Sequence, residues 1–228
     1  MRFQDAAPDA RAIVYAQIQA DPSVARAAAL LADVTYEQRL LARAVMNGET
    51  TDATAWRTMF PSLFDAAVDP GARDHAEGIL AASLDVADRG EQVRSQFRGA
   101  IVESVTALLL ERRATGGAVR RERRLLFDGV RAEIHPYDVT VERPGRAEAY
   151  DCKWGARGIG PDVLHQLDDA RTHAADEDEP LVVALVVFDA RLSCDVRLDR
   201  QTAPTAGIGL VTIETLDELA TQPAVPLP

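Results

Sequence analysis

The sequence predicts a mixed α/β protein of the α+β kind, in which an all-helical region precedes an α-β-β-β-α-β core. Two observations indicate this. Alanine-rich segments with apolar residues at helical spacing fill residues 1–90. From residue 91 onward, short β-prone stretches alternate with strong turn signals. A chain of 228 residues can hold two small domains. We therefore expect one domain over residues 1–90 and another over residues 91–228.

The helices of the first region are predicted from their starts and ends. Pro8-Asp9 and Asp21-Pro22-Ser23 are typical of a first helical turn, because proline fits that position. Asn47-Gly48, Pro70-Gly71 and Arg89-Gly90 punctuate the pattern. No recognisable catalytic cluster occurs in this region of the sequence. We expect it to form a homodimer, or to bind a protein partner or the substrate.

The core elements follow in order after Arg89-Gly90. A helix is predicted over 91–113 and stops at Thr115-Gly116-Gly117. Turn signals at Asp128-Gly129 and Pro144-Gly145 separate three predicted strands, which cover about 119–127, 133–142 and 148–154. Gly158-Ile159-Gly160-Pro161 opens a helix that runs to about residue 175. The apolar run 181–188 predicts a strand covered on both faces, and a last strand over 209–213 precedes a short helix.

Composition sets the broad class of the protein. Hydrophobic residues make up 47% and charged residues 27%, and no apolar run is long enough to span a bilayer. Cys152 and Cys194 form no C-x-x-C pair, so neither a disulfide framework nor a zinc pattern is indicated. We expect a reduced, cytoplasmic protein without a membrane partner. The net charge of −11 argues against nucleic-acid binding, unless basic residues cluster or a partner contributes.

Lys153 is the only lysine of the chain, which otherwise uses arginine for positive charge. It stands two residues after Asp151, so both side chains share one face of the predicted strand. Asp138 lies near the middle of the preceding strand. Pairing of the two strands across the intervening turn is expected to bring Asp138 beside Asp151. Adjacent carboxylates require positive charge, which Lys153 and a hard cation such as Mg²⁺ can supply, with the backbone carbonyl of Cys152 as a further ligand.

Glu103 is the only charged residue in the segment Gly99–Leu110 of the helix before the strands. Apolar residues surround it on most of the helix circumference, so the carboxylate is expected to be buried. A buried charge needs a partner. We expect that partner to be the cation held by Asp138 and Asp151.

The Glu103 helix, Pro136-Tyr137-Asp138 and Asp151-Cys152-Lys153, in this order of elements, resemble the PD-(D/E)xK nuclease superfamily. That superfamily has the restriction-endonuclease-like fold, and the resemblance covers about residues 91–190. The sequence departs from the motif in placing Tyr137 between the proline and the aspartate. Gln166 matches a glutamine that many members carry on the following helix. Ala170 stands where RecB-like members have a tyrosine.

This resemblance implies a metal-dependent DNA endonuclease, with DNA rather than RNA as substrate, of the restriction or phage-defence type. Asp138 and Asp151 would hold Mg²⁺, for which Mn²⁺ can substitute, and Glu103 would bind it directly or through water. Lys153 would orient or deprotonate the attacking water and stabilise charge on the phosphate. Gln166 would complete the catalytic set.

Other interpretations of the same residues remain open. Asp151 and Lys153 can instead be a same-face ion pair on an exposed sheet. The basic run of the first strand can contact phosphates, form a solvated face or protect an edge; it comprises Arg120, Arg121, Arg123 and Arg124. Arg157 is a further candidate phosphate contact.

Two other classes of function also remain open. The chain can be a non-cleaving interaction module with a nuclease fold. Residues 155–160 have G-x-x-G-x-G spacing after a strand, which leaves a nucleotide-binding α/β domain as another alternative to a plain turn.

Overall fold

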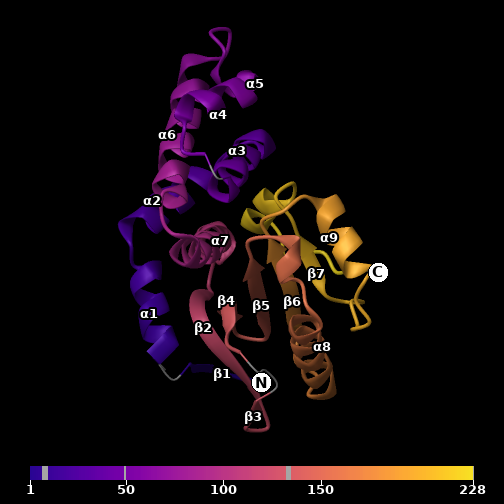
Figure 1. The fold of residues 1–228 in the computed structure, drawn as a ribbon. Helices are drawn as coiled ribbons and strands as arrows, with labels where there is room; N and C mark the ends of the chain where they lie inside the picture. The colour runs from indigo at the N-terminus through magenta and orange to yellow at the C-terminus, as the bar shows by residue number, and fades with distance from the viewer. Residues whose placement is uncertain (7–9, 49, 132–134, 228) are drawn as a thin grey trace. The chain divides into compact units, whose positions relative to one another are not determined.

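The computed structural model describes residues 1–6, 10–48, 50–131 and 135–227, which form helices and a mixed β-sheet (Figure 1). The chain divides into two compact units. One unit is Ala10–Val105, and the other combines Met1–Asp9 with Thr106–Pro228. The boundary falls inside one helix, α7, which runs from Glu91 to Arg113.

The helical unit contains the first part of α7 and the helices that precede it. They are α1 (Ala10–Gln19), α2 (Pro22–Leu31), α3 (Tyr36–Asn47), α4 (Ala53–Met59), α5 (Pro61–Phe64) and α6 (Pro70–Ala87). Side chains cap several helix starts, because the first backbone N–H groups lack helical partners. Asp21 accepts a hydrogen bond from the Ser23 N–H, and Thr35 and Gln38 form a capping box at α3. Helix α6 packs against α2 and α3, and this contact buries Leu80 and Leu41.

The other unit is built on one mixed sheet with the strand order β1-β2-β4-β5-β6-β7, and β3 pairs with β2. The strands are β1 (Arg2–Asp5), β2 (Ala118–Phe127), β3 (Val130–Arg131), β4 (Tyr137–Arg143), β5 (Arg146–Lys153), β6 (Leu181–Val187) and β7 (Gly209–Val211). Pairing is antiparallel from β1 to β5 and parallel from β5 to β7. The remaining elements are η1 (Ala156–Gly158), α8 (Pro161–Asp176), α9 (Arg191–Leu198) and η2 (Leu216–Ala220).

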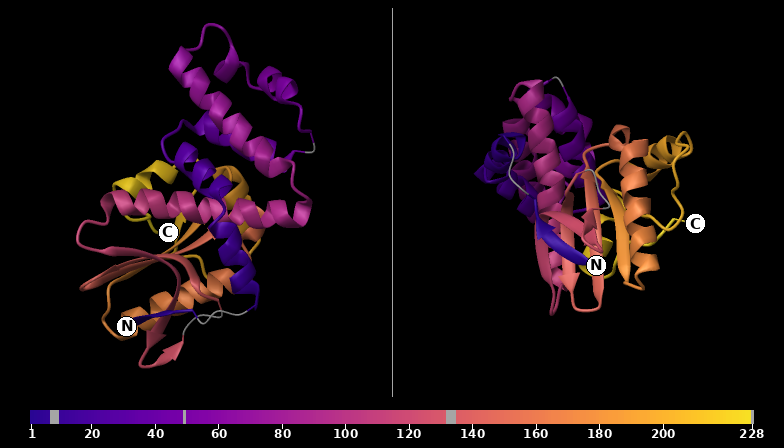
Figure 2. Two further views of the ribbon diagram at one scale, coloured as in Figure 1. Left: turned by 90° about the vertical axis from the view of Figure 1, so that its left-hand side faces the viewer. Right: turned by 90° about the horizontal axis from the view of Figure 1, so that it is seen from below.

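Helix α8 lies along one face of the sheet (Figures 1 and 2), and Leu164 and Leu167 belong to the same core cluster as Leu185 and Val187 of β6. On the other face, Arg113 in the last turn of α7 binds both oxygens of Glu148. Tyr150 donates to the same carboxylate. Strand β5 therefore alternates between an apolar contact with α8 and a buried polar contact with α7.

The structure agrees with the predicted α+β class. Between α7 and β6 it contains one more strand than predicted, the two-residue β3. The prediction of an all-helical start is wrong, because β1 pairs with β2 and Asp5 lies opposite Arg123. The sheet unit therefore includes the first residues, and its other boundary lies at Val105/Thr106 instead of 90/91. No break in the α7 sequence marks that point. The predicted helix start at Pro8-Asp9 and the first residues of the strand expected over 133–142 lie outside the described residues.

Helix α9 was not predicted. It has only eight residues, of which Cys194 and Leu198 are buried, so the stretch is too short for a reliable helical pattern. The predicted strand at 209–213 and the short helix after it correspond to β7 and η2.

Candidate functional site

Strands β4 and β5 bring Asp138 beside Asp151. Val139 lies opposite Tyr150 and Val141 opposite Glu148, so one more step in this register places Asp138 opposite Asp151. Asp138 Oδ2 also accepts a hydrogen bond of 2.5 Å from the backbone N–H of Cys152. Both observations put the Asp138 carboxylate next to the segment Asp151–Lys153.

The Lys153 ammonium forms an ion pair with Asp151. The two side chains are 26% and 8% exposed, so this is not the exposed surface pair considered as an alternative. Burial by itself would lower the pKa of Lys153, but the negative charges of Asp151 and then Asp138 outweigh it and raise the pKa above its ordinary value. Lys153 therefore carries a positive charge at neutral pH. It lies close enough to both aspartates to respond to their charge.

The partners across the parallel pair explain the burial of Asp151. Asp151 lies opposite Leu185 and Lys153 opposite Val187, and both β6 residues belong to the core under α8. Charges in such surroundings interact more strongly than in water, because the local dielectric constant is lower. The candidate site thus lies where an apolar core reaches the end of β5.

Cys152 separates the two charged residues and presents its backbone to β4. Its N–H points to Asp138, and its carbonyl points to the same side because both groups of one strand residue share an edge. Its thiol is on the α7 face, 3.6 Å from the Thr106 hydroxyl. The Cys152 carbonyl therefore faces the strand that carries Asp138, as a metal-ligand role requires.

The donor set fits a hard divalent cation. Mg²⁺ commonly binds one or two protein carboxylates and keeps several waters, so Asp138, Asp151 and the Cys152 carbonyl meet its requirements. The described part of the chain contains no group of three or more His, Cys, Asp or Glu side chains arranged to hold a metal. A site here would thus be completed by waters and substrate oxygens.

A tight turn after β5 closes over the stem of Lys153. A Cβ atom on Gly158 would lie 2.9 Å from Lys153 Cδ and 3.1 Å from its Cβ and Cγ, so only glycine leaves room for the lysine. Asp189, buried at the end of β6, accepts hydrogen bonds from the N–H groups of Ala156 (3.0 Å) and Ala190 (2.8 Å). Neither role was predicted from the sequence. The signal in the sequence was an acid directly after the apolar run 181–188.

Glu103 is buried, as predicted, but its described partners are in α1. The Tyr15 hydroxyl donates to Oε1 at 2.5 Å, and Gln19 Nε2 donates to Oε2 at 2.7 Å. Both partners belong to the helical unit, so the carboxylate does not need a cation in order to be satisfied. Its direct or water-mediated binding of a metal stays a prediction.

Gln166 lies on α8 and is buried, but its amide binds backbone. Nε2 donates to the His135 carbonyl and Oε1 accepts from the His135 N–H, both at 3.1 Å. The Tyr137 hydroxyl donates to the Gln166 carbonyl at 3.2 Å. These contacts hold the segment that precedes Asp138. The catalytic role of Gln166 stays a prediction.

The predicted phosphate contacts of β2 are not equivalent. Arg123 binds Glu142 (Nε–Oε1 2.7 Å) and also Asp5, so its guanidinium joins β1, β2 and β4 instead of facing a ligand. Because β1 pairs with β2 at this position, edge protection is not its role either. Arg120 is exposed, whereas Arg121 and Arg124 are half-buried. Arg157, in η1, is exposed directly beside Gly158.

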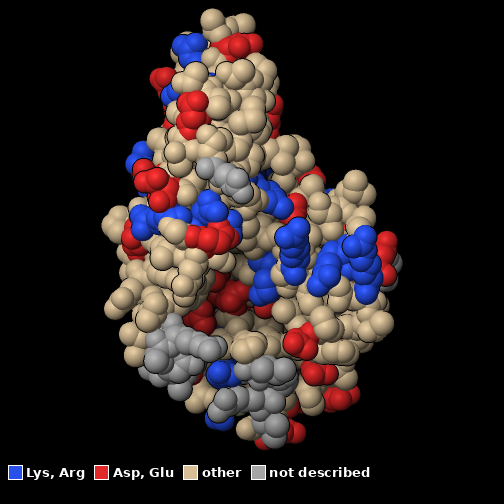
Figure 3. Space-filling view, in the orientation of Figure 1, with Lys and Arg blue, Asp and Glu red and all other residues tan. Residues whose placement is uncertain are grey.

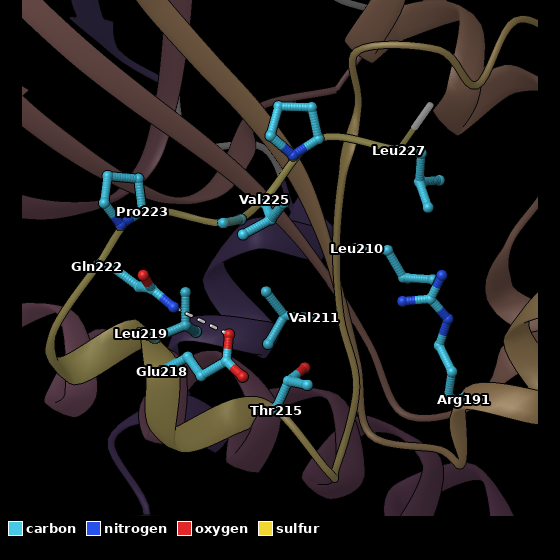
Figure 4. A pocket seen from close by; sticks show the side chains of 12 residues that line it. Arg191, Leu210, Val211, Thr215, Glu218, Leu219, Gln222, Pro223, Val225 and Leu227 are labelled. Carbon is cyan, nitrogen blue, oxygen red and sulfur yellow. Dashed lines mark hydrogen bonds between the residues drawn. The ribbon is translucent and has the colours of Figure 1, made fainter.

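A pocket of about 250 Å³ lies elsewhere in the sheet unit (Figure 4). It is lined by β7, η2 and the C-terminal segment, and Gln222 there donates to Glu218. None of the predicted site residues lines it. Its shape therefore has no bearing on the chemistry of Asp138, Asp151 and Lys153.

Comparison with known proteins assigns the chain to no family. No protein-family model matches it, and no curated protein matches it. The crystal structure of protein VC1899 from Vibrio cholerae is similar over 88% of this chain, with 17% sequence identity and a TM-score of 0.48. This chain spans 55% of that protein's length. A similarity at this level carries no inference about function.

Among the described helices, none has the length and apolar character needed to cross a membrane.

Proposed function

We propose that the chain is a metal-dependent phosphodiesterase that cleaves nucleic acid, most specifically a DNA endonuclease. The supporting observation is the buried group formed by Asp151 and Lys153, with Asp138 fixed beside it across the β4–β5 pair. Burial of clustered carboxylates around one ammonium costs free energy, so their presence at the end of a central strand favours a functional role. The order of elements supports the same proposal through the resemblance to PD-(D/E)xK nucleases, and with it a restriction or phage-defence role.

Each residue of the site would have a separate role in phosphodiester cleavage. Asp138, Asp151 and the Cys152 carbonyl would hold Mg²⁺, which when bound supplies a Lewis acid and lowers the pKa of its water. The Lys153 ammonium would orient that water and stabilise negative charge on the phosphate. Without a bound metal, the negative charges of Asp151 and Asp138 raise the pKa of Lys153, so its protonated amine can donate to that water.

Cleavage assays with matched variants test the proposal. Supercoiled plasmid, linear duplex and single-stranded DNA and RNA are incubated with Mg²⁺ or Mn²⁺ and with EDTA. Asp138→Asn and Asp151→Asn are expected to lose cleavage, whereas Glu111→Gln, which changes an exposed carboxylate on α7, keeps it. Cleavage that persists in EDTA, or in both aspartate variants, would contradict the proposal.

A non-cleaving interaction module is the second candidate. It is favoured by the protein partners of the acids: Lys153 pairs with Asp151, and Tyr15 and Gln19 bind Glu103. The net charge of −11 also favours protein contacts over nucleic acid. Calorimetric titration with Mg²⁺ and Mn²⁺ decides between the two candidates. A folded protein that binds neither ion and cleaves no substrate would be the non-cleaving module.

A nucleotide-binding domain stays the third alternative. The Lys153 stem occupies the space beside Gly158, so close packing against lysine is a sufficient reason for that glycine.

A further inference from the structure

A group of arginines surrounds the turn that follows Lys153. Arg157 lies in η1, and Arg197 and Arg200 lie in α9 and just beyond its end. On the face that carries η1 and α9, Figure 3 shows Lys and Arg side chains gathered close together. The sequence analysis included only Arg157, because α9 was not predicted.

These three arginines form no ion pair among the described residues. Arg113 and Arg123 bind carboxylates inside the sheet unit, and Arg191 at the start of α9 pairs with Asp195 at 2.7 Å. Arg157 and Arg200 are exposed, and Arg197 is half-buried. A guanidinium without a carboxylate partner is available to an external anion.

Backbone contacts connect this group to the candidate site. Arg197 Nε donates to the Ile159 carbonyl at 2.8 Å, which fixes α9 against the turn. Arg200 follows Arg197 by three residues and its N–H bonds to the Arg197 carbonyl, so both lie on neighbouring positions of one helical turn. Gly158, next to Arg157, touches the stem of Lys153. The arginine group therefore starts at Arg157, next to the glycine that lies beside the Lys153 stem.

We propose that Arg157, Arg197 and Arg200 form a binding surface for the phosphodiester backbone of a nucleic-acid strand that extends away from Lys153. The inference rests on the proposed function, because only a strand bound at Lys153 would continue onto this surface. Guanidinium groups suit phosphate because their N–H groups match two phosphate oxygens. The nearby carboxylates of Asp195 and Asp199 keep the surface only moderately basic, so we expect a weak affinity that falls as the salt concentration rises.

Fluorescence anisotropy in EDTA tests the surface without cleavage. The probes are a labelled single-stranded DNA, the RNA of the same sequence and the DNA duplex, each titrated with the full chain at several salt concentrations. Arg157→Ala with Arg200→Ala is compared with Arg2→Ala and Arg146→Ala, which remove two exposed, equally unpaired arginines elsewhere in the sheet unit. Circular dichroism verifies that both double variants fold.

The Arg157/Arg200 variant is expected to bind single strands roughly tenfold more weakly, with a salt slope lower by about 1.4, as two lost phosphate contacts require. The Arg2/Arg146 variant is expected to bind like the wild type. Equal losses in both variants, or binding of polyglutamate as tight as that of the strand, would overturn the surface. If the wild type cleaves DNA and the Arg157/Arg200 variant binds normally, the binding surface is contradicted and the proposed nuclease activity is not. Binding that requires these arginines, without cleavage of any substrate, supports the surface and removes the proposed nuclease activity.

Discussion

The carboxylate of Asp138 accepts a 2.5 Å hydrogen bond from the backbone N–H of Cys152, the residue between Asp151 and Lys153. The side chain thus continues the pairing of β4 with β5 beyond the last backbone pair, Val139 with Tyr150. A carboxylate held in this way keeps its position before any ligand arrives. The chemistry proposed for the site depends on that fixed position.

Two substitutions of Asp138 should separate the effect of its hydrogen bond to Cys152 from the effect of its negative charge. Asp138→Asn retains an oxygen that can accept from Cys152, so we expect nearly wild-type stability but weaker Mg²⁺ binding. Asp138→Ala removes the acceptor and should cost about 1–3 kcal/mol in the free energy of unfolding. Urea denaturation and calorimetry measure the two effects. Equal Mg²⁺ affinity in Asp138→Asn and the wild type would remove Asp138 from the metal site.

Gly158→Ala should displace Lys153. The new methyl group would lie 2.9 Å from Lys153 Cδ, so the side chain must move away from Asp151. Gly160→Ala is the matched control, because nothing lies within 4 Å of its Cβ position. Since the chain has one lysine, lysine-selective isotope labelling gives a single side-chain NMR signal. We expect this signal to shift in Gly158→Ala only; a shift of the same size in Gly160→Ala would contradict the packing argument.

The Arg113–Glu148 pair should make stability depend on acid pH. Burial raises the pKa of Glu148, but the hydrogen bonds from Arg113 and Tyr150 outweigh it and hold the pKa below the ordinary 4.5. The pair therefore stabilises the fold fully above about pH 4.5, and this contribution is lost as the pH falls through the lowered pKa. Glu148→Gln should cost about 3–5 kcal/mol at pH 7, because it leaves a buried guanidinium unpaired.

Urea unfolding of Glu148→Gln and the wild type at a series of pH values checks this dependence. The difference in stability between them is expected to shrink as the pH falls below 4.5. A difference that stays constant from pH 7 to pH 3 would show that folding does not shift the pKa of Glu148, and would contradict this prediction.

The elements that were predicted correctly are those fixed by local signals. Helix α7 and strand β6 follow from the spacing of their own apolar residues, and the short turn Arg143–Arg146 sets the register that brings Asp138 to Asp151. Short-range periodicity and turn chemistry are written within a few residues, so one sequence is enough to locate them.

The features that were missed depend on residues far apart in the chain. Strand β1 exists because Asp5 lies opposite Arg123, and Glu103 is satisfied by Tyr15 and Gln19 instead of by a nearby charge. Gly158 matters only because the Lys153 stem passes beside it. No local pattern reports such contacts, since tertiary pairing and close packing decide them.

The central claim is that Lys153, Asp151 and Asp138 act together on a phosphodiester, and the initial rate of plasmid cleavage in Mg²⁺ by Lys153→Arg tests it most directly. Arginine keeps the positive charge, but its planar guanidinium differs in shape from the compact ammonium that pairs with Asp151. With folding verified by circular dichroism, we predict a rate lower by about 100-fold or more, as for loss of one oriented donor. A Lys153→Arg protein that cleaves as fast as the wild type would contradict the account.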